Sequence, residues 1–259
     1  MAGAVVGSPR AAARAGASWE TAAMTDPDDP AATGAEAPAA AIPTEAVPAE
    51  AVPPDAAQAA AGQSDPKAVF RRYLDSGRDA LLFKLEGASE YDVRRPLTPT
   101  GTNLLGLVKH LSGVEAGYLG ECFGRPVPDM PAWYAEMGSN DSEPNADMWA
   151  TADESQESIV ELYQRVRAHA DRTIDELDLT APGTVPWWGP DAGEVSLQRL
   201  LVHVIAEEQR HLGQADIVRE NIDGAVGLRA GVSNLPDESE QWWADYHRRL
   251  QQTAEQFRQ

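Results

Sequence analysis

Apolar side chains recur at spacings of three and four residues along most of this chain, from about residue 64 to residue 257. That period is typical of helices that bury one stripe of their surface, and no stretch shows the alternation of a half-buried strand. We therefore predict an all-α fold in which four helices form a bundle and an additional, packed C-terminal helix follows. The predicted helices span about residues 66–87, 103–123, 153–177, 196–221 and 238–257.

Residues that favour helix ends support these boundaries. Asp65 can cap the first helix, and Pro66 follows near the first helical position, where its missing N–H costs nothing. Ser196 can cap the fourth helix, which we expect to end before Gly224.

Two segments without a helical period separate the helices. Four prolines break any helix between residues 124 and 151, yet large apolar side chains make this segment too apolar for a loop surrounded by water: Trp133, Tyr134, Met137, Met148 and Trp149. We therefore expect it to pack over one end of the bundle. The segment between residues 182 and 193 is also rich in turn residues, and it surrounds the pair Trp187 and Trp188.

The first 63 residues form an Ala/Pro-rich extension with almost no aromatic or branched side chains. Such a segment cannot bury enough apolar surface to offset the entropy lost on ordering. We predict that residues 1–63 are disordered and that residues 64–259 form one helical domain.

Charge and cysteine content exclude several classes of protein. A formal net charge of −20 opposes binding to nucleic acid or to an anionic membrane surface, and no apolar run approaches the roughly 20 residues of a membrane span. Cys122 is the only cysteine, so no internal disulfide can form, and no segment resembles a secretory signal. We expect a cytoplasmic protein with no nucleic-acid and no membrane partner.

Three polar side chains occupy the apolar faces of predicted helices, where an unpaired polar group costs about 1–3 kcal/mol. His110 follows Leu107 by three residues and precedes Val114 by four, so it lies on the inner face of the second helix. Glu207 and His211, four residues apart, continue the inner stripe of the fourth helix.

The residue types alone leave the role of these three side chains open. Two histidines and one carboxylate can bind Zn²⁺ with one position left for another ligand, and the same set binds Fe²⁺. An E-x-x-x-H pair on a helix is also common as an ion pair, and a single inner-face histidine is usually a hydrogen-bonded core residue.

A family resemblance favours the metal. The stretches NLLGLVKHL (residues 103–111) and LVHVIAEEQRHLGQADIVRE (residues 201–220) resemble the two metal-bearing helices of the DinB/YfiT-like superfamily. The resemblance implies a DinB-like four-helix bundle and the metal ligands His110, Glu207 and His211. Many members use three histidines; a His, Glu, His set resembles that of the mycothiol-dependent maleylpyruvate isomerases, which are zinc proteins. Zinc is the ion that the resemblance favours, with iron or nickel as alternatives.

Other residues near these positions have two interpretations each. His203 lies one turn before Glu207 and can orient a ligand or bond a backbone carbonyl. Trp187 and Trp188 can line the pocket or pack beside the helix start. Arg210 and Arg219 can bind a carboxylate of the substrate or remain solvated helix charges.

The leading hypothesis for function is a metal-dependent thiol S-transferase that joins a low-molecular-weight thiol, with mycothiol as the expected co-substrate, to a small electrophile. One alternative is a metal-assisted hydrolase in which Glu208 or a loop carboxylate is the base. Another is a non-catalytic metal-binding or stress-response protein. Aromatic side chains between Trp242 and Phe257 can also mediate a homodimer.

Overall fold

The computed structural model describes residues 65–137, 143–189 and 194–258. The predicted disordered extension, residues 1–63, lies outside the described residues. The elements follow in the order α2 (Pro66–Phe83), α3 (Glu90–Arg94), α4 (Leu104–Tyr118), η1 (Glu121–Phe123), α5 (Ala132–Glu136), α6 (Gln156–Glu176), β1 (Pro182–Thr184), η2 (Pro186–Trp188), β2 (Glu194–Ser196), α7 (Leu197–Asp223) and α8 (Glu240–Glu255).

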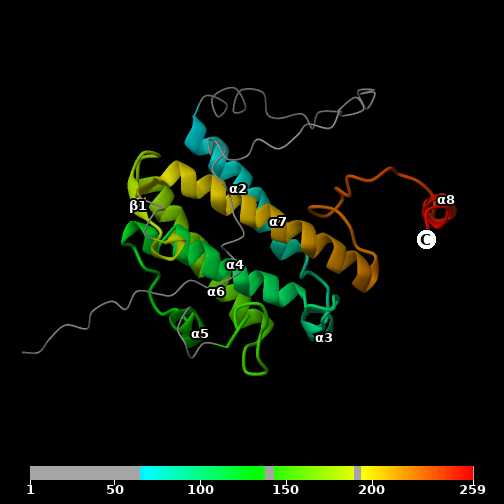
Figure 1. Ribbon diagram of the computed structural model, residues 1–259, viewed down its shortest axis with the longest axis horizontal. Coiled ribbons are helices and arrows are strands. Elements are labelled where there is room, and N and C mark those ends of the chain that lie inside the picture. The colour runs from blue at the N-terminus through cyan, green and yellow to red at the C-terminus, as the bar shows by residue number, and fades with distance from the viewer. Residues whose placement is uncertain (1–64, 138–142, 190–193, 259) are drawn as a thin grey trace, which may run out of the picture.

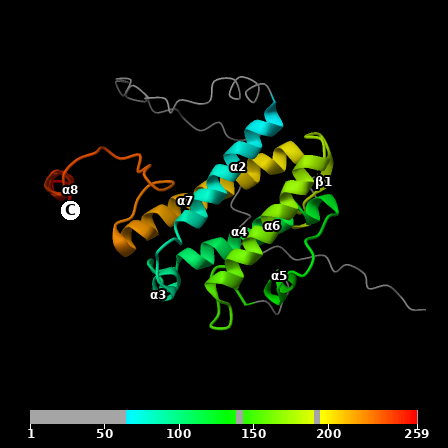
Figure 2. The same ribbon diagram turned by 180° about the vertical axis from the view of Figure 1, so that it is seen from behind.

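The four long helices α2, α4, α6 and α7 form the predicted bundle. Figure 1 shows α7 and α4 side by side at the front, and the view from behind in Figure 2 brings α2 and α6 forward. Helix α2 packs on α7, α7 packs on α4, and α4 packs on α6. Helix α2 therefore lies diagonally opposite α4 across the core, and α6 lies diagonally opposite α7. Within the described residues, no helix is both long enough and apolar enough to cross a lipid bilayer.

The helix ends follow the local chemistry of the sequence. The side chain of Asp65 accepts a hydrogen bond from the Lys67 amide at 3.0 Å, and that of Ser196 accepts one from Arg199 at 3.3 Å. Gly224 ends α7 with a φ of 77°. These three predicted boundaries are confirmed.

The first two helices are shorter than predicted. The first ends at Phe83 and is followed by the separate short helix α3, and the second ends at Tyr118. The chain bends after Tyr118 at Gly120, where a Cβ atom would lie only 2.4 Å from the carbonyl oxygen of Ala116.

Every residue of α4 is buried, not only the predicted inner stripe. The bundle covers one side, and the segments between the long helices cover the other. Cβ atoms added at Gly113 and Gly117 would lie 3.4 Å from Trp133 and 3.2 Å from Trp187. The described part of the proline-containing loop does pack on the bundle, but along α4, at Gly106 and Gly113, and not over one end as predicted.

Two features differ from the prediction. Strands β1 and β2 form a small antiparallel sheet, with Gly183 opposite Val195, where only turns were expected. Each strand has three residues, too few to show an alternating pattern. The C-terminal helix α8 forms as predicted, but it is not packed: no residue of α8 is buried, and both views show it apart from the bundle. Its aromatic rings contact one another instead, with Trp242 stacked on Tyr246 at 5.2 Å.

Candidate metal centre

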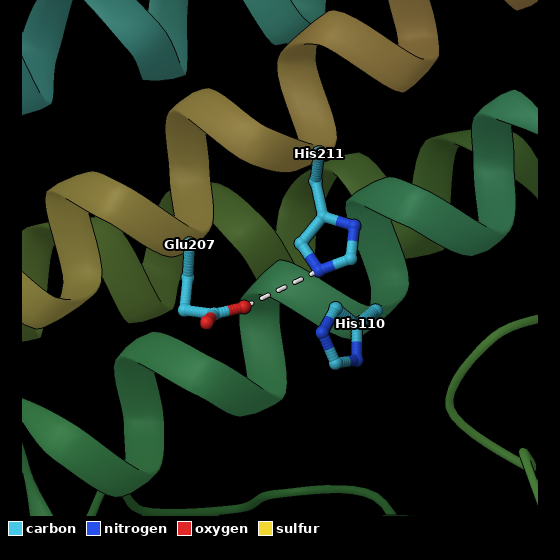
Figure 3. Close-up of side chains that lie close together, drawn as sticks. All are labelled: His110, Glu207 and His211. Carbon is cyan, nitrogen blue, oxygen red and sulfur yellow. Dashed lines mark ion pairs between the residues drawn. The ribbon is translucent and has the colours of Figure 1, made fainter. Parts of the chain in front are cut away.

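The three side chains that the sequence marks as metal ligands converge between α4 and α7 (Figure 3). His110 comes from α4, while Glu207 and His211 come from successive turns of α7. One ligand-type atom of each lies within 4.8 Å of those of the other two. His211 Nε2 lies 3.5 Å from Glu207 Oε2, and the rings of His110 and His211 meet edge to face with centroids 4.7 Å apart.

The three side chains are largely shielded from water. His110 is 2% exposed and His211 is 8% exposed, while Glu207 is half-buried. The interaction with His211 lowers the pKa of Glu207 below its ordinary value, against the opposing effect of partial burial. Glu207 is therefore a carboxylate at neutral pH and supplies the one formal negative charge among the three.

Each histidine is held from behind by an oxygen acceptor. Asp147 Oδ2 lies 2.6 Å from His110 Nδ1, and Gln214 Oε1 lies 2.8 Å from His211 Nδ1. An oxygen atom can only accept in these contacts, so Nδ1 of each ring is the donor and Nε2 is the nitrogen that a cation would use. Both rings thus offer the nitrogen that a cation needs.

Sequence reasoning missed both of these partners. Gln214 lies three residues after His211 on the same helix, so helical spacing could have identified it. Asp147 lies in a loop with no period, and no sequence signal connects it to His110. Burial, the largest single effect, raises the pKa of Asp147, but the hydrogen bond and the charge interaction with His110 and the nearby Lys109 together outweigh it, and the net pKa is lowered.

The geometry fits a divalent cation. Two ligand atoms about 2.1 Å from a tetrahedral zinc ion are about 3.4 Å apart, close to the 3.5 Å between His211 Nε2 and Glu207 Oε2. Two imidazoles and one carboxylate are ligands for zinc and for iron. These three donors would leave a fourth tetrahedral position for another ligand.

Trp187 and Trp188 pack around one tyrosine beside the site. Both indole N–H groups donate to the Tyr118 hydroxyl, each at 3.0 Å. The ring of His203 meets Tyr118 at a centroid distance of 4.5 Å and Trp188 at 5.1 Å. Burial lowers the pKa of His203, so this histidine is neutral at neutral pH. Trp187, Trp188 and His203 thus form one aromatic cluster around Tyr118.

The two arginines considered for substrate binding differ in environment. Arg210 is exposed on α7. Arg219 is buried and donates to the carbonyl oxygens of Lys84 and Glu86 at 2.7 and 2.8 Å, besides its ion pair with Asp223. Arg219 thus ties α7 to the end of α2 and is a structural residue.

Glu208, considered as the base of a hydrolase, does not lie with the three candidate ligands. It is fully buried and accepts a hydrogen bond from the Tyr163 hydroxyl at 2.8 Å. It faces α2, since a Cβ at Gly77 would lie 2.8 Å from its Cγ. Glu208 therefore does not face the three candidate ligands, and a hydrolase would have to use the other candidate base, a loop carboxylate.

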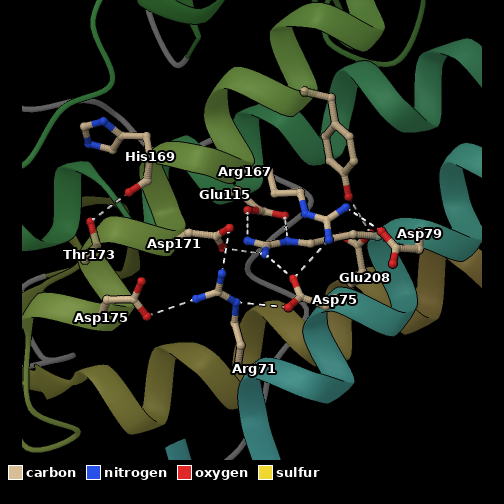
Figure 4. Close-up of polar contacts among 12 residues, drawn as sticks. Arg71, Asp75, Asp79, Glu115, Arg167, His169, Asp171, Thr173, Asp175 and Glu208 are labelled. Atoms are coloured by element: carbon tan, nitrogen blue, oxygen red, sulfur yellow. Dashed lines mark hydrogen bonds and ion pairs between the residues drawn. The ribbon is translucent and has the colours of Figure 1, made fainter. Parts of the chain in front are cut away.

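Two buried polar pairs join helices that lie diagonally opposite in the bundle, and Glu208 belongs to one of them (Figure 4). The guanidinium of Arg78 on α2 donates to both carboxylate oxygens of Glu115 on α4, and neither side chain is exposed. Tyr163 and Glu208 connect α6 to α7. Burial, with Glu115 adding to it, raises the pKa of Glu208 to about 8.

The chain matches a known protein family. A family model described as mycothiol-S-transferase matches residues 69–224, which is more than half of the 259 residues. The matched range contains the bundle, the three candidate ligands and Asp147, and it ends before α8. A comparison with curated proteins finds no match.

Proposed function

Because the chain belongs to the mycothiol-S-transferase family, we propose that it transfers a low-molecular-weight thiol of the mycothiol type to a small electrophile at a divalent cation. The cation is held by His110, Glu207 and His211. The convergence of these three donors within the matched bundle is the observation that carries the proposal. Zinc is the proposed ion, and iron or nickel would use the same donors.

The charges of the donors suit an anionic co-substrate. Glu207 supplies one negative charge, and the two imidazoles coordinate as neutral rings because Asp147 and Gln214 keep their protons on Nδ1. A divalent cation in this set would keep a net positive charge and would stabilise a thiol in its thiolate form, as metals do for a coordinating cysteine.

The surroundings of the site favour that chemistry. Burial of His110 and His211 keeps water away from the donors, and electrostatic stabilisation of an anion is stronger where water is excluded. We propose that the aromatic cluster of Tyr118, Trp187, Trp188 and His203 borders the position of the thiol or the electrophile. Glu208, one of the two bases considered for the hydrolase alternative, lies on the other side of α7 from the candidate ligands.

A cobalt-substituted protein would test the proposal. Co²⁺ bound by His110, Glu207 and His211 gives a visible spectrum, and added mycothiol or a simpler thiol should produce a sulfur-to-cobalt charge-transfer band. His247→Ala, which removes an exposed histidine on α8 outside the candidate ligands, is the control, and its Co²⁺ spectrum with and without thiol should equal that of wild type. A protein that binds Co²⁺ but shows no charge-transfer band at saturating thiol would overturn the S-transferase proposal.

A further inference from the structure

We propose that Asp147 is a positioning residue of the metal site, whose carboxylate fixes the tautomer and the orientation of His110. Residues 147–154 form a segment, called the strap below, that is hydrogen-bonded to α3 and α4 and holds Asp147 beside His110. The inference rests on the proposed use of His110 as a metal ligand. It adds a residue that does not itself contact the cation and that comes from a segment without helical period.

The contact between Asp147 and His110 is short and shielded from water. Oδ2 lies 2.6 Å from Nδ1, and the two side chains are 8% and 2% exposed. A buried carboxylate costs several kcal/mol unless a donor compensates it. His110 is that donor, so the two residues stabilise each other. A histidine whose Nδ1 is bonded to a carboxylate presents Nε2 to a metal in one orientation.

The strap is fixed by side chains from α3, α4 and the turn between them. The backbone carbonyl oxygens of residues 148–151 each accept a hydrogen bond from a side chain. Asn103 donates to Met148 at 3.2 Å, Lys109 to Trp149 at 3.0 Å, and Arg94 to Ala150 and Thr151 at 3.2 and 3.0 Å.

Lys109 adds a second anchor at the end of the strap. It is the residue immediately before His110, it is 1% exposed, and its ammonium group donates to Glu154 at 2.8 Å. Glu154 in turn accepts from the Thr151 amide at 2.8 Å. The element that carries His110 therefore also holds the strap that carries Asp147.

The strap approaches α4 so closely that no side chain fits between them. A Cβ atom at Gly106 would lie 1.8 Å from the carbonyl oxygen of Met148. Gly106 lies one helical turn before His110, so this contact fixes the position along the α4 axis at which Asp147 meets the His110 ring.

These anchors argue against a merely structural role for Asp147. The strap is held by Arg94, Asn103 and Lys109 without any contribution from Asp147. A buried carboxylate adds desolvation cost to that arrangement, and the ring of His110 is the side chain that offsets this cost with a hydrogen bond. The position of Asp147 is thus explained by what it does to His110.

The test compares full-length wild type, Asp147→Ala and Asp147→Asn for Zn²⁺ affinity, measured by competition with a chromophoric chelator. We expect each variant to bind Zn²⁺ about 10–100-fold more weakly than wild type. Asp153→Asn removes an exposed carboxylate from the same strap and is the matched control, with affinity expected to equal that of wild type. Thermal melting checks that each variant is folded.

The tautomer of His110 gives a second readout that involves neither metal nor activity. In metal-free wild type, imidazole ¹⁵N chemical shifts should show the proton of His110 on Nδ1, and Asp147→Ala should populate the other tautomer. A folded Asp147→Ala with wild-type Zn²⁺ affinity, or a wild-type His110 protonated on Nε2, overturns the inference. If wild type itself binds no divalent cation, the proposed function fails with it, and that result is distinct from equal affinities of wild type and variant.

Discussion

Glu207 Oε2 and His211 Nε2 lie 3.5 Å apart, a separation that suits two ligands of one cation and also suits an ion pair within a helix. The third donor distinguishes the two arrangements. His110 comes from another helix, and its ring is held edge to face against His211. A pair that served only to stabilise α7 would need no buried imidazole from α4.

We predict that Glu207→Ala lowers Zn²⁺ affinity by more than about 100-fold. This is a larger loss than is typical when a residue that hydrogen-bonds a ligand, but does not itself contact the metal, is removed. The reason is that Glu207 supplies the negative charge of the donor set. Glu220→Ala, which alters an exposed carboxylate on the same helix, is the control and should bind as wild type. Metal content after dialysis, with competition titration, measures the effect. Unchanged affinity of Glu207→Ala would show that the pair is an ion pair only.

The buried carboxyl group of Glu208 should give the protein a characteristic pH dependence. Its pKa is raised from 4.5 to about 8, first by burial and then by the nearby charge of Glu115. Between these two pKa values the folded state holds a proton that the unfolded state releases, so the free energy of unfolding falls as pH rises through the window.

Glu208→Gln should remove this dependence, because the amide cannot ionise and can still accept the Tyr163 hydrogen bond. We predict that the variant gains stability relative to wild type as pH rises from about 5 to 8, by up to a few kcal/mol, and that the gain levels off above about pH 8. Urea denaturation at several pH values measures the difference. A constant difference across this range would mean that Glu208 is ionised in the folded protein.

At the scale of elements, α4 is the helix on which the fold depends. It is buried on all sides, it carries His110 and Glu115, and its glycines allow the strap and two tryptophans to approach. A helix covered on one side only would show a single apolar stripe and would hold the opposite face in water. Full burial explains why α4 carries small residues such as Gly106, Gly113 and Gly117 on the sides that other segments approach.

Gly106→Ala should separate the strap from α4, since the new Cβ would lie 1.8 Å from the Met148 carbonyl oxygen. We predict a loss of about 1–3 kcal/mol in stability and weaker Zn²⁺ binding, because Asp147 moves with the strap. Gly213→Ala on α7 is the matched control: nothing lies within 4 Å of its Cβ, and replacing a helical glycine by alanine should stabilise the protein by about 0.5–1 kcal/mol. Denaturation curves and chelator competition measure both effects. If the two variants had equal stability and equal Zn²⁺ affinity, the strap could move away from α4 without affecting the fold or the metal site.

At the scale of the whole molecule, the bundle is complete without α8. The buried core residues come from α2 to α7 and the segments between them, and the family match ends at residue 224. The rings of Trp242, Trp243 and Tyr246 pack on one another, so α8 adds no area to the core. A 16-residue helix with no buried residue gains little from packing and is of marginal stability in water.

We predict that deleting residues 236–259 leaves the melting temperature of the bundle within about 2 °C of that of the full chain and leaves its Zn²⁺ content unchanged, because a deletion that exposes no core surface costs well under 1 kcal/mol. Calorimetry and metal analysis measure the two quantities. A clear loss of either would show that α8 docks on the bundle.

Much of this architecture could be predicted from the sequence. Helical periodicity located the bundle helices, capping residues such as Asp65 and Ser196 located their starts, and polar residues on apolar stripes identified His110, Glu207 and His211. Each of these signals is local, because it depends on residues within one or two turns of a helix. The strands β1 and β2 were missed because three residues carry no period.

The tertiary structure alone decided which side chains from separate segments meet. His110 and Asp147 are 37 residues apart, as are Arg78 and Glu115, and no local pattern encodes either contact. The sequence by itself determined the fold class, the bundle helices and the candidate ligands, since backbone geometry and burial of apolar stripes follow from neighbouring residues. Packing of the strap on Gly106 then decided how His110 is oriented, and the closed core decided that α8 lies apart, because both depend on how segments distant in the chain fill the same space.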